Sequence, residues 1–263
     1  MMATVKPKSL RLRASGHGGD PVRSGLGLVE IRLADLDELH DPLDALDARA
    51  GLLAEDERAW AAQPSNDVRR RRRTARIALR VLLLHAGEAG ARGGALTADA
   101  GGKPFLAGGA RAFNVSHSGR WALFALASRG PVGIDIEGPR AVALGEARQA
   151  MIQAAGLAIT GDNAEGGAFL AGWTRLEAFA KARGSGVGAL LSELGITAQG
   201  VRTLTVDDVA RKAAAVVGAS GLEVAALDLP VGLFGAVCAP AGILGERPVW
   251  SVMGAGECGV GLF

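Results

Sequence analysis

The stretch Phe113-Asn-Val-Ser-His-Ser-Gly119, followed by Val132-Gly-Ile-Asp-Ile-Glu137, decides the fold expected of this chain. Alternating apolar residues in the first stretch and the run 121–127 predict two strands, and the second stretch predicts a third after a turn. On the third strand Asp135 and Glu137 are two residues apart, so both carboxylates point to the same face. Their repulsion is commonly relieved by a hard cation such as Mg²⁺, which often lies beside phosphates. The pattern therefore predicts a metal site that handles phosphate.

The alternative for these two carboxylates is the solvated face of an edge strand, which is the commoner place for an isolated Asp-x-Glu pair. Other motifs favour the metal interpretation. A helix predicted over residues 168–183 carries Glu177 and Lys181 four residues apart, hence on one face. By themselves these two would form an ordinary exposed ion pair. Gly184-Ser-Gly186 is typical of a left-handed cap that ends such a helix.

The composition predicts a globular chain, long enough for one large domain or two of ordinary size. Of 263 residues, 49% are hydrophobic, and the net charge is only +2, so there is no general signal for polyanion binding. Cys238 and Cys258 form neither a disulfide framework nor a zinc pattern, which favours a reducing compartment. Neither an apolar signal region nor a membrane-spanning run is present in the sequence. We expect a cytoplasmic protein without a membrane partner.

Five consecutive arginines, Arg69 to Arg73, suggest nucleic acid at first sight. On the helix predicted here they are spread about 100° apart per residue, so they cannot all face one ligand. A buried apolar stripe leaves Arg72, Arg76 and Arg80 at four-residue spacing along another face, which would hold phosphates or stay solvated. Aromatic stacking residues are scarce and the net charge is small, so no nucleic-acid partner is expected.

The remaining pattern predicts two halves that each mix helices with an antiparallel meander. A half-buried strand begins near residue 26, and Gly138-Pro139 is the expected boundary. Residues 1–25 are then a disordered basic extension, 26–138 the N-terminal half and 139–263 the C-terminal half. Further elements of the second half are expected over 144–159, 168–183, 207–217, 222–229, 233–239 and 248–253. The second half echoes the first without a clear sequence repeat.

Four blocks of the chain together resemble the 4'-phosphopantetheinyl transferases of the surfactin-synthetase-activating (Sfp-like) type. The order and spacing of the blocks are those of the family, and an upstream Asp56-Glu57-Arg58 and the Arg-rich helix accompany them. The blocks are Gly102-Lys-Pro104, Phe113-Asn-Val-Ser-His-Ser118, Gly133-Ile-Asp-Ile-Glu137 and Trp173-Thr-Arg-Leu-Glu-Ala-Phe-Ala-Lys181 with Gly184-Ser-Gly186. The resemblance extends from Leu28 to Gly186.

This resemblance implies an α+β fold of two similar halves with pseudo-twofold symmetry, each a small antiparallel sheet with packed helices. Coenzyme A and Mg²⁺ would lie in the cleft between the halves. The implied activity transfers the 4'-phosphopantetheine arm of coenzyme A to a serine of an apo acyl or peptidyl carrier protein and releases 3',5'-ADP. Such an enzyme would serve fatty acid, polyketide or nonribosomal peptide biosynthesis, and we expect it to be a monomer.

By the same resemblance, Asp135, Glu137 and Glu177 would bind the magnesium ion, which makes Asp135 essential to catalysis. Glu177 is also the best candidate base for the carrier serine. Lys181 would touch the phosphates and stabilise or protonate the leaving group. The residues expected to hold coenzyme A are Arg58, Arg72, Lys103, Asn114, Ser116, His117 and Lys181. Arg58 would contact the 3'-phosphate, with Arg72 as the reserve candidate, and Arg76 matches no family residue.

Two departures from the family pattern keep alternatives open. Leu176 stands where the family usually has a lysine, which leaves a non-catalytic homologue that binds coenzyme A or a carrier protein as the second hypothesis. Residues 141–172 lack the Phe-rich, acidic-centred pattern of the region that meets the carrier protein, so the carrier is not indicated. The small carrier-protein synthases of the same superfamily are a third possibility, but their chains are about half this length.

Overall fold

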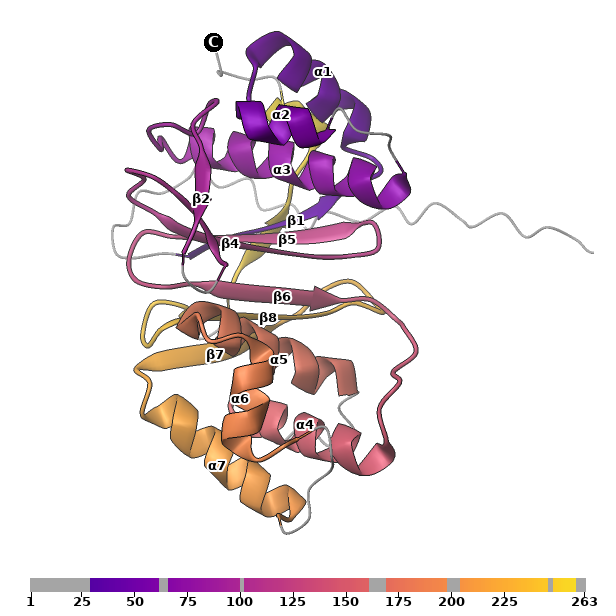
Figure 1. Cartoon of the computed structure of the whole chain (residues 1–263), viewed down its shortest axis with the longest axis vertical. Coiled ribbons are helices and arrows are strands. Elements are labelled where there is room, and N and C mark those ends of the chain that lie inside the picture. The colour runs from indigo at the N-terminus through magenta and orange to yellow at the C-terminus, as the bar shows by residue number, and fades with distance from the viewer. Residues whose placement is uncertain are drawn as a thin grey trace, which may run out of the picture.

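The protein has an α+β architecture of four layers, shown by a computed structural model that describes residues 29–61, 66–99, 102–160, 169–197, 204–245 and 248–258. Helices, one sheet, a second sheet and further helices follow one another from end to end of the molecule (Figure 1). The expected basic extension at residues 1–25 lies outside the described residues. None of the helices in the described ranges is long and apolar enough to cross a membrane.

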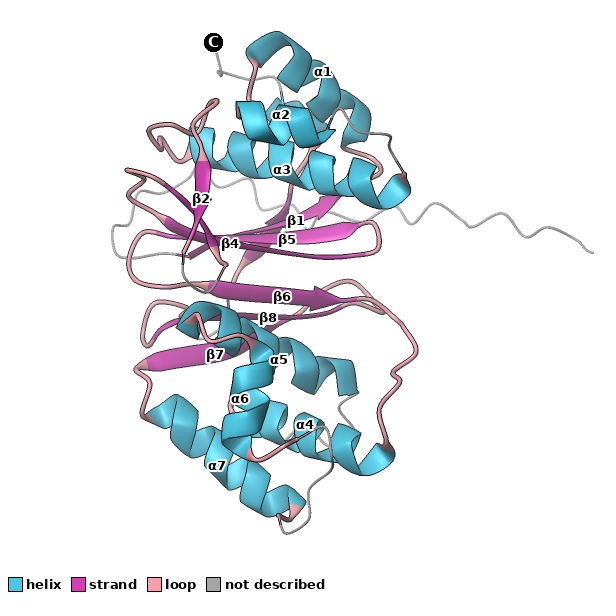
Figure 2. Ribbon diagram, in the orientation of Figure 1, coloured by secondary structure: helices cyan, strands magenta, loops and turns pink. Residues whose placement is uncertain are grey.

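The first two layers come mainly from the N-terminal half. The helices are α1 (His40–Ala50), α2 (Glu55–Ala61) and α3 (Asp67–His85). They cover a sheet of order β4-β5-β1-β9, formed by β1 (Val29–Asp35), β4 (Ala112–Ser118), β5 (Trp121–Ala127) and β9 (Trp250–Val252) (Figure 2). Beside it, β2 (Leu96–Ala98) and β3 (Pro104–Leu106) form a separate hairpin.

The other two layers come from the rest of the chain. A sheet of order β6-β8-β7 is formed by β6 (Gly133–Glu137), β7 (Leu222–Leu227) and β8 (Phe234–Pro240). The helices are α4 (Glu146–Ala158), α5 (Phe169–Arg183), α6 (Val187–Leu194) and α7 (Val206–Gly218), and a 3-10 turn, η1 (Ala255–Cys258), follows β9. These elements confirm the helices and strands expected after the boundary.

The two halves repeat one connectivity. In each, a first strand is followed by helices and then by a hairpin whose second strand pairs antiparallel with the first strand, which gives the orders β4-β5-β1 and β7-β8-β6. The halves also exchange strands across the expected boundary. β6 precedes Gly138-Pro139 but is bonded to β8, and β9 returns from the C-terminal segment to pair parallel with β1.

Three apolar clusters hold the layers together. One lies between α1–α3 and the first sheet, a second between the two sheets, and a third between the second sheet and α4–α7. Ile134 and Ile136 belong to the cluster between the sheets, so the opposite face of β6 carries Asp135 and Glu137. This confirms that the two carboxylates share a face of the strand.

Helix α5 lies unusually close to β6 because residue 133 is a glycine. A Cβ atom placed on Gly133 would lie 2.0 Å from the carbonyl oxygen of Ala178 and 2.5 Å from the amide nitrogen of Ala182. Only a residue without a side chain permits this approach. The contact sets the position of the α5 face that carries Glu177 and Lys181. Gly184 then ends the helix at φ 72°, as the sequence predicts.

We expect Gly133→Ala to lower the free energy of unfolding by about 1–3 kcal/mol, because the added methyl group has to displace α5. Urea unfolding followed by circular dichroism measures this change. The control is Gly188→Ala, at an open position inside α6 where a Cβ meets no atom within 4 Å. That change should be neutral or stabilise by up to about 1 kcal/mol. Equal stability of Gly133→Ala and the wild type would contradict the close packing.

Candidate active site

Strand β4 divides the motif Asn114-Val-Ser-His-Ser118 between two faces, because successive side chains of a strand point in opposite directions. Asn114 and Ser116 face β6, where both make buried hydrogen bonds. Val115 and His117 face the helices and line a pocket there. From the resemblance, we expected both Ser116 and His117 to bind phosphates of coenzyme A. The structure places them on opposite sides of one strand.

Side chains join the two sheets where β4 meets β6, each strand being the edge of its own sheet. The side-chain oxygen of Asn114 accepts a hydrogen bond from the backbone N–H of Ile134 at 2.9 Å, and the Ser118 hydroxyl accepts one from Gly138 at 2.9 Å. These bonds satisfy donors of the edge strand β6 that would otherwise be unpaired. We call this β4–β6 contact the seam. Asn114, expected to bind coenzyme A, is first of all a part of it.

Lys181 of α5 is held at the seam by three acceptors. Its ammonium nitrogen lies 2.7 Å from Asp135 Oδ1, 3.2 Å from Ser116 Oγ and 3.2 Å from the carbonyl oxygen of Ile134. The Ser116 hydroxyl donates to the same Asp135 oxygen over 2.7 Å. An ammonium group has three N–H donors, so all of them are used. The structure thus brings together Asp135, Ser116 and Lys181, as the resemblance expects.

The carboxylates beside Lys181 are partly deprived of water, which favours their neutral forms. Burial raises the pKa of Asp135, against the opposing charge of Lys181. Burial also raises the pKa of Glu177; the charge of Lys181 lowers it, and the nearby charges of Asp135 and Glu137 raise it further. Three carboxylates from β6 and α5 therefore interact electrostatically in one place. They would gain from additional positive charge.

Asp135, Glu137 and Glu177 offer oxygen donors of the kind that a hard divalent cation prefers. The second oxygen of Asp135, Oδ2, is buried and has no hydrogen-bond partner among the described residues. Glu137 is held by Arg140, whose Nε and Nη2 donate to its two oxygens over 3.0 and 2.8 Å. Within the described ranges, no three side chains of the His, Cys, Asp and Glu type are grouped closely enough to hold a metal ion. In this arrangement Arg140 and Lys181 supply the positive charge beside the carboxylates.

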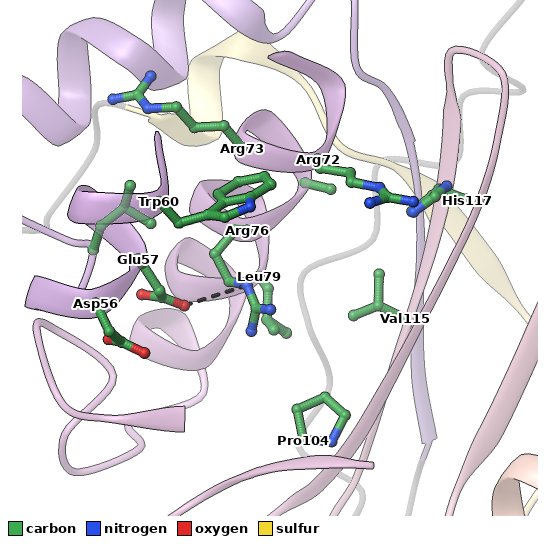
Figure 3. Close-up of a pocket in the computed structure, with 12 residues that line it drawn as sticks. Asp56, Glu57, Trp60, Arg72, Arg73, Arg76, Leu79, Pro104, Val115 and His117 are labelled. Atoms are coloured by element: carbon green, nitrogen blue, oxygen red, sulfur yellow. Dashed lines mark ion pairs between the residues drawn. The ribbon is translucent and has the colours of Figure 1, made fainter. Parts of the chain in front are cut away.

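A pocket of about 510 Å³ lies on the other side of β4, between α2, α3 and the hairpin (Figure 3). Apolar walls come from Leu53, Leu79, Pro104 and Val115. Its polar and aromatic lining is Asp56, Glu57, Trp60, Arg72, Arg73, Arg76 and His117. Partial burial, and after it the neighbouring Arg72 guanidinium, lowers the pKa of His117. The lowered pKa favours the neutral imidazole, so Arg72 is the source of positive charge at this end of the pocket. We call this space the arginine pocket.

A smaller pocket of about 260 Å³ has lining residues in common with the arginine pocket and with the seam. Pro104 and Val115 line both pockets, and Asn114, Lys181 and Gly184 line the smaller one. Lys103 also lines it, but its ammonium group donates to the carbonyl oxygen of Val132 at 2.6 Å, and burial lowers its pKa. A ligand that fills both pockets would extend from Arg72 to Lys181.

Two expected arginines lie elsewhere. Arg58 does not line the arginine pocket; its guanidinium donates to the carbonyl oxygen of Leu53 at 2.7 Å. The expectation that Arg80 lies on an open face is wrong. It is 0% exposed, pairs with Glu57 at 2.7 Å and donates to the carbonyl oxygens of Gly90 and Ala91. That face of α3 is covered by α2 and by the turn after α3, so Arg80 joins these segments and is not accessible to a ligand.

Sequence reasoning missed three residues that shape the site. Trp60 and Glu57 line the arginine pocket, and Glu57 also holds Arg76 at 3.2 Å. Arg140 holds Glu137. A weak signal existed for Glu57, which lies inside the Asp56-Glu57-Arg58 block. Trp60 had a similar signal, because it lies one turn after Asp56 on the same short helix.

No protein-family model matches the chain, and no curated protein gives a significant match to it.

We expect Asn114→Ala to lower the free energy of unfolding by about 1–3 kcal/mol, because the buried N–H of Ile134 loses its acceptor. Chemical unfolding measures this loss. His117→Ala, a change on the opposite face of the same strand, is the control and should stay within about 0.5 kcal/mol of the wild type. A similar small effect of both substitutions would show that side chains do not hold the seam.

Proposed function

We propose that the protein is a Mg²⁺-dependent 4'-phosphopantetheinyl transferase that moves the phosphopantetheine arm of coenzyme A onto a serine of an apo carrier protein. The observation that carries the proposal is the cluster of Asp135, Lys181 and Ser116 beside Glu177. Its Lys181 lines the smaller pocket, which shares Pro104 and Val115 with the arginine pocket. A pyrophosphate near Lys181 and a nucleotide in the arginine pocket would use the whole of this space. The resemblance of the motifs to the transferase family supports the same reading.

Glu177 is our candidate for the base of this reaction. Burial raises its pKa, which brings a carboxylate closer to the range in which it accepts a proton at neutral pH. Among the described residues no hydrogen bond to its carboxylate is found, so an oxygen is available to receive a proton. In the transfer, the carrier serine oxygen forms a bond to the β-phosphorus of coenzyme A, and its proton passes to Glu177. The bond from that phosphorus to the oxygen of 3',5'-ADP breaks.

Lys181 would stabilise the leaving group, because its side chain lines the smaller pocket and its ammonium group lies at the seam. Charge grows on the departing 3',5'-ADP oxygen mainly in the transition state, so a fixed cation lowers the barrier there. Asp135 and Ser116 position this ammonium group. A magnesium ion held by Asp135, Glu137 and Glu177 would neutralise the pyrophosphate oxygens. For that, Glu137 has to exchange its contact with Arg140.

A second candidate function is a binding protein for coenzyme A or for a carrier protein, without transfer. The observation that favours it is that the cations of the site already have partners: Lys181 uses all three donors, and Arg140 occupies both oxygens of Glu137. Such a site would bind a nucleotide in the arginine pocket but would lack a free charge at the seam. The experiment that follows separates the two functions.

Mass spectrometry of a panel of apo carrier proteins, incubated with this protein, coenzyme A and Mg²⁺, tests the proposal. We expect at least one carrier to gain a phosphopantetheine group. Asp135→Asn and Lys181→Met should slow the transfer about 100-fold or more, and Lys181→Met should reduce turnover more than coenzyme A binding.

The matched control is Arg183→Met, which removes an exposed cation of the same helix that pairs with Glu193. It should leave the transfer unchanged. If coenzyme A binds but no carrier in the panel is modified, the binding function is favoured. Full activity of Asp135→Asn would remove this carboxylate from the site.

The raised pKa of Glu177 should be measurable in the metal-free protein. Burial stabilises the neutral form, so the carboxyl group should lose its proton at a pKa above the ordinary value of 4.5, in a titration coupled to that of Asp135. NMR of the carboxyl carbons measures this pKa without Mg²⁺, because a bound cation would lower it. Circular dichroism over the same pH range controls for unfolding. A pKa at or below 4.5 would contradict the burial of Glu177.

A further inference from the structure

The arginine pocket has an uncompensated charge of opposite sign at each end. Among the described residues, Asp56 and Arg72 have no hydrogen-bond or ion-pair partner. The other charged groups of the lining are paired: Arg73 with Asp44 and Asp47, and Arg76 with Glu57. Figure 3 shows Asp56 and Arg72 on opposite sides of the drawn residues. A ligand that fits this pocket carries a hydrogen-bond donor at one end and negative charge at the other.

Trp60 lies between these two charged ends (Figure 3). Its half-buried indole lines the pocket, while the Arg69 guanidinium covers the ring at 5.8 Å and is not itself part of the lining. Across the pocket stand the apolar side chains of Pro104 and Val115. An aromatic face opposite an apolar wall is suited to a planar ring system, which stacks on the indole.

These three features fit an adenine nucleotide. Its exocyclic amino group would donate to Asp56, its ring would stack on Trp60, and a phosphate would bind the Arg72 guanidinium, whose planar fork matches phosphate geometry. The volume of about 510 Å³ is within the usual range for small-molecule sites. Hypoxanthine has an oxygen in place of the amino group, so it would face the Asp56 carboxylate with an acceptor.

We propose that Trp60 is the platform for the base of coenzyme A and that Asp56 selects adenine by accepting a hydrogen bond from its amino group. The proposal rests on the proposed function and adds the residues that recognise the adenine base. Neither residue touches the reacting atoms, so both act in binding and specificity. The chemistry of the transfer remains with Asp135, Glu177 and Lys181.

Isothermal titration calorimetry of the full chain, without carrier protein, tests the proposal with three ligands. The ligands are 3',5'-ADP, inosine 3',5'-bisphosphate, which lacks the amino group, and 4'-phosphopantetheine, which lacks the nucleotide. Trp60→Leu should weaken 3',5'-ADP about ten-fold to a hundred-fold, because the stacking surface is lost, and should leave 4'-phosphopantetheine unchanged. Trp60→Phe should retain most of the affinity. Trp250→Phe, whose indole donates to the carbonyl oxygen of Asp228 outside this pocket, is the control.

Asp56→Asn tests base selection without risk to the fold, because the residue is exposed. The wild type should bind 3',5'-ADP about ten-fold more tightly than the inosine analogue, and Asp56→Asn should remove most of this preference, because an amide both donates and accepts. Equal affinity of the wild type for the two nucleotides, or an unchanged preference in Asp56→Asn, would overturn the role of Asp56. An unchanged affinity of Trp60→Leu for 3',5'-ADP would overturn the role of Trp60.

The outcome is separate from that of the transfer assay. If the protein binds 3',5'-ADP through Trp60 but modifies no carrier protein, the role of Trp60 is supported and the transferase function is not. If the protein carries out the transfer but its Trp60→Leu variant binds 3',5'-ADP normally, the transferase function is supported and the role of Trp60 is overturned. Absence of 3',5'-ADP binding to the wild type would overturn the platform as well.

Discussion

The site depends on one contact, the seam where the edge strand β4 of the first sheet meets the edge strand β6 of the second. Edge strands expose unpaired backbone groups, and here the side chains of Asn114 and Ser118 satisfy those of β6. The apolar cluster between the sheets fixes the distance between the layers. Because β4 and β6 are held in register in this way, Ser116 faces Asp135, and the two halves of the chain contribute to one site.

A glycine and a buried ion pair complete this arrangement. Gly133 lets α5 approach β6 closely enough for Lys181 to reach Asp135 at 2.7 Å. Buried ion pairs add little net stability, because the loss of hydration offsets most of the attraction. Here the ion pair fixes the position of the Lys181 ammonium group, which has three acceptors. Among the described residues, Oδ2 of Asp135 has no hydrogen-bond partner, and burial raises the pKa of both Asp135 and Glu177. A site of this kind favours a further cation.

Much of this could be predicted from the sequence wherever a local period decides the outcome. The period of two placed Asp135 and Glu137 on one face, and the helical period placed Glu177 and Lys181 on one face. The local periodicity of the sequence does not show how helices and strands pack against one another. Arg80 follows the same four-residue spacing as Arg72 and Arg76, yet α2 covers it, so its spacing gave no sign of its burial. Likewise, the parallel pairing of β9 with β1 and the contact of Arg140 with Glu137 are set by tertiary structure.

The most direct test of the account is anomalous diffraction from crystals grown with Mn²⁺ and coenzyme A. Mn²⁺ accepts the same oxygen ligands as Mg²⁺ and can be located by its scattering. The account predicts one manganese ion bound by Asp135, Glu137 and Glu177, with the pyrophosphate beside Lys181, the adenine on Trp60 and Arg140 turned away from Glu137. Manganese bound elsewhere, with Arg140 still on Glu137 and the nucleotide outside the arginine pocket, would contradict it.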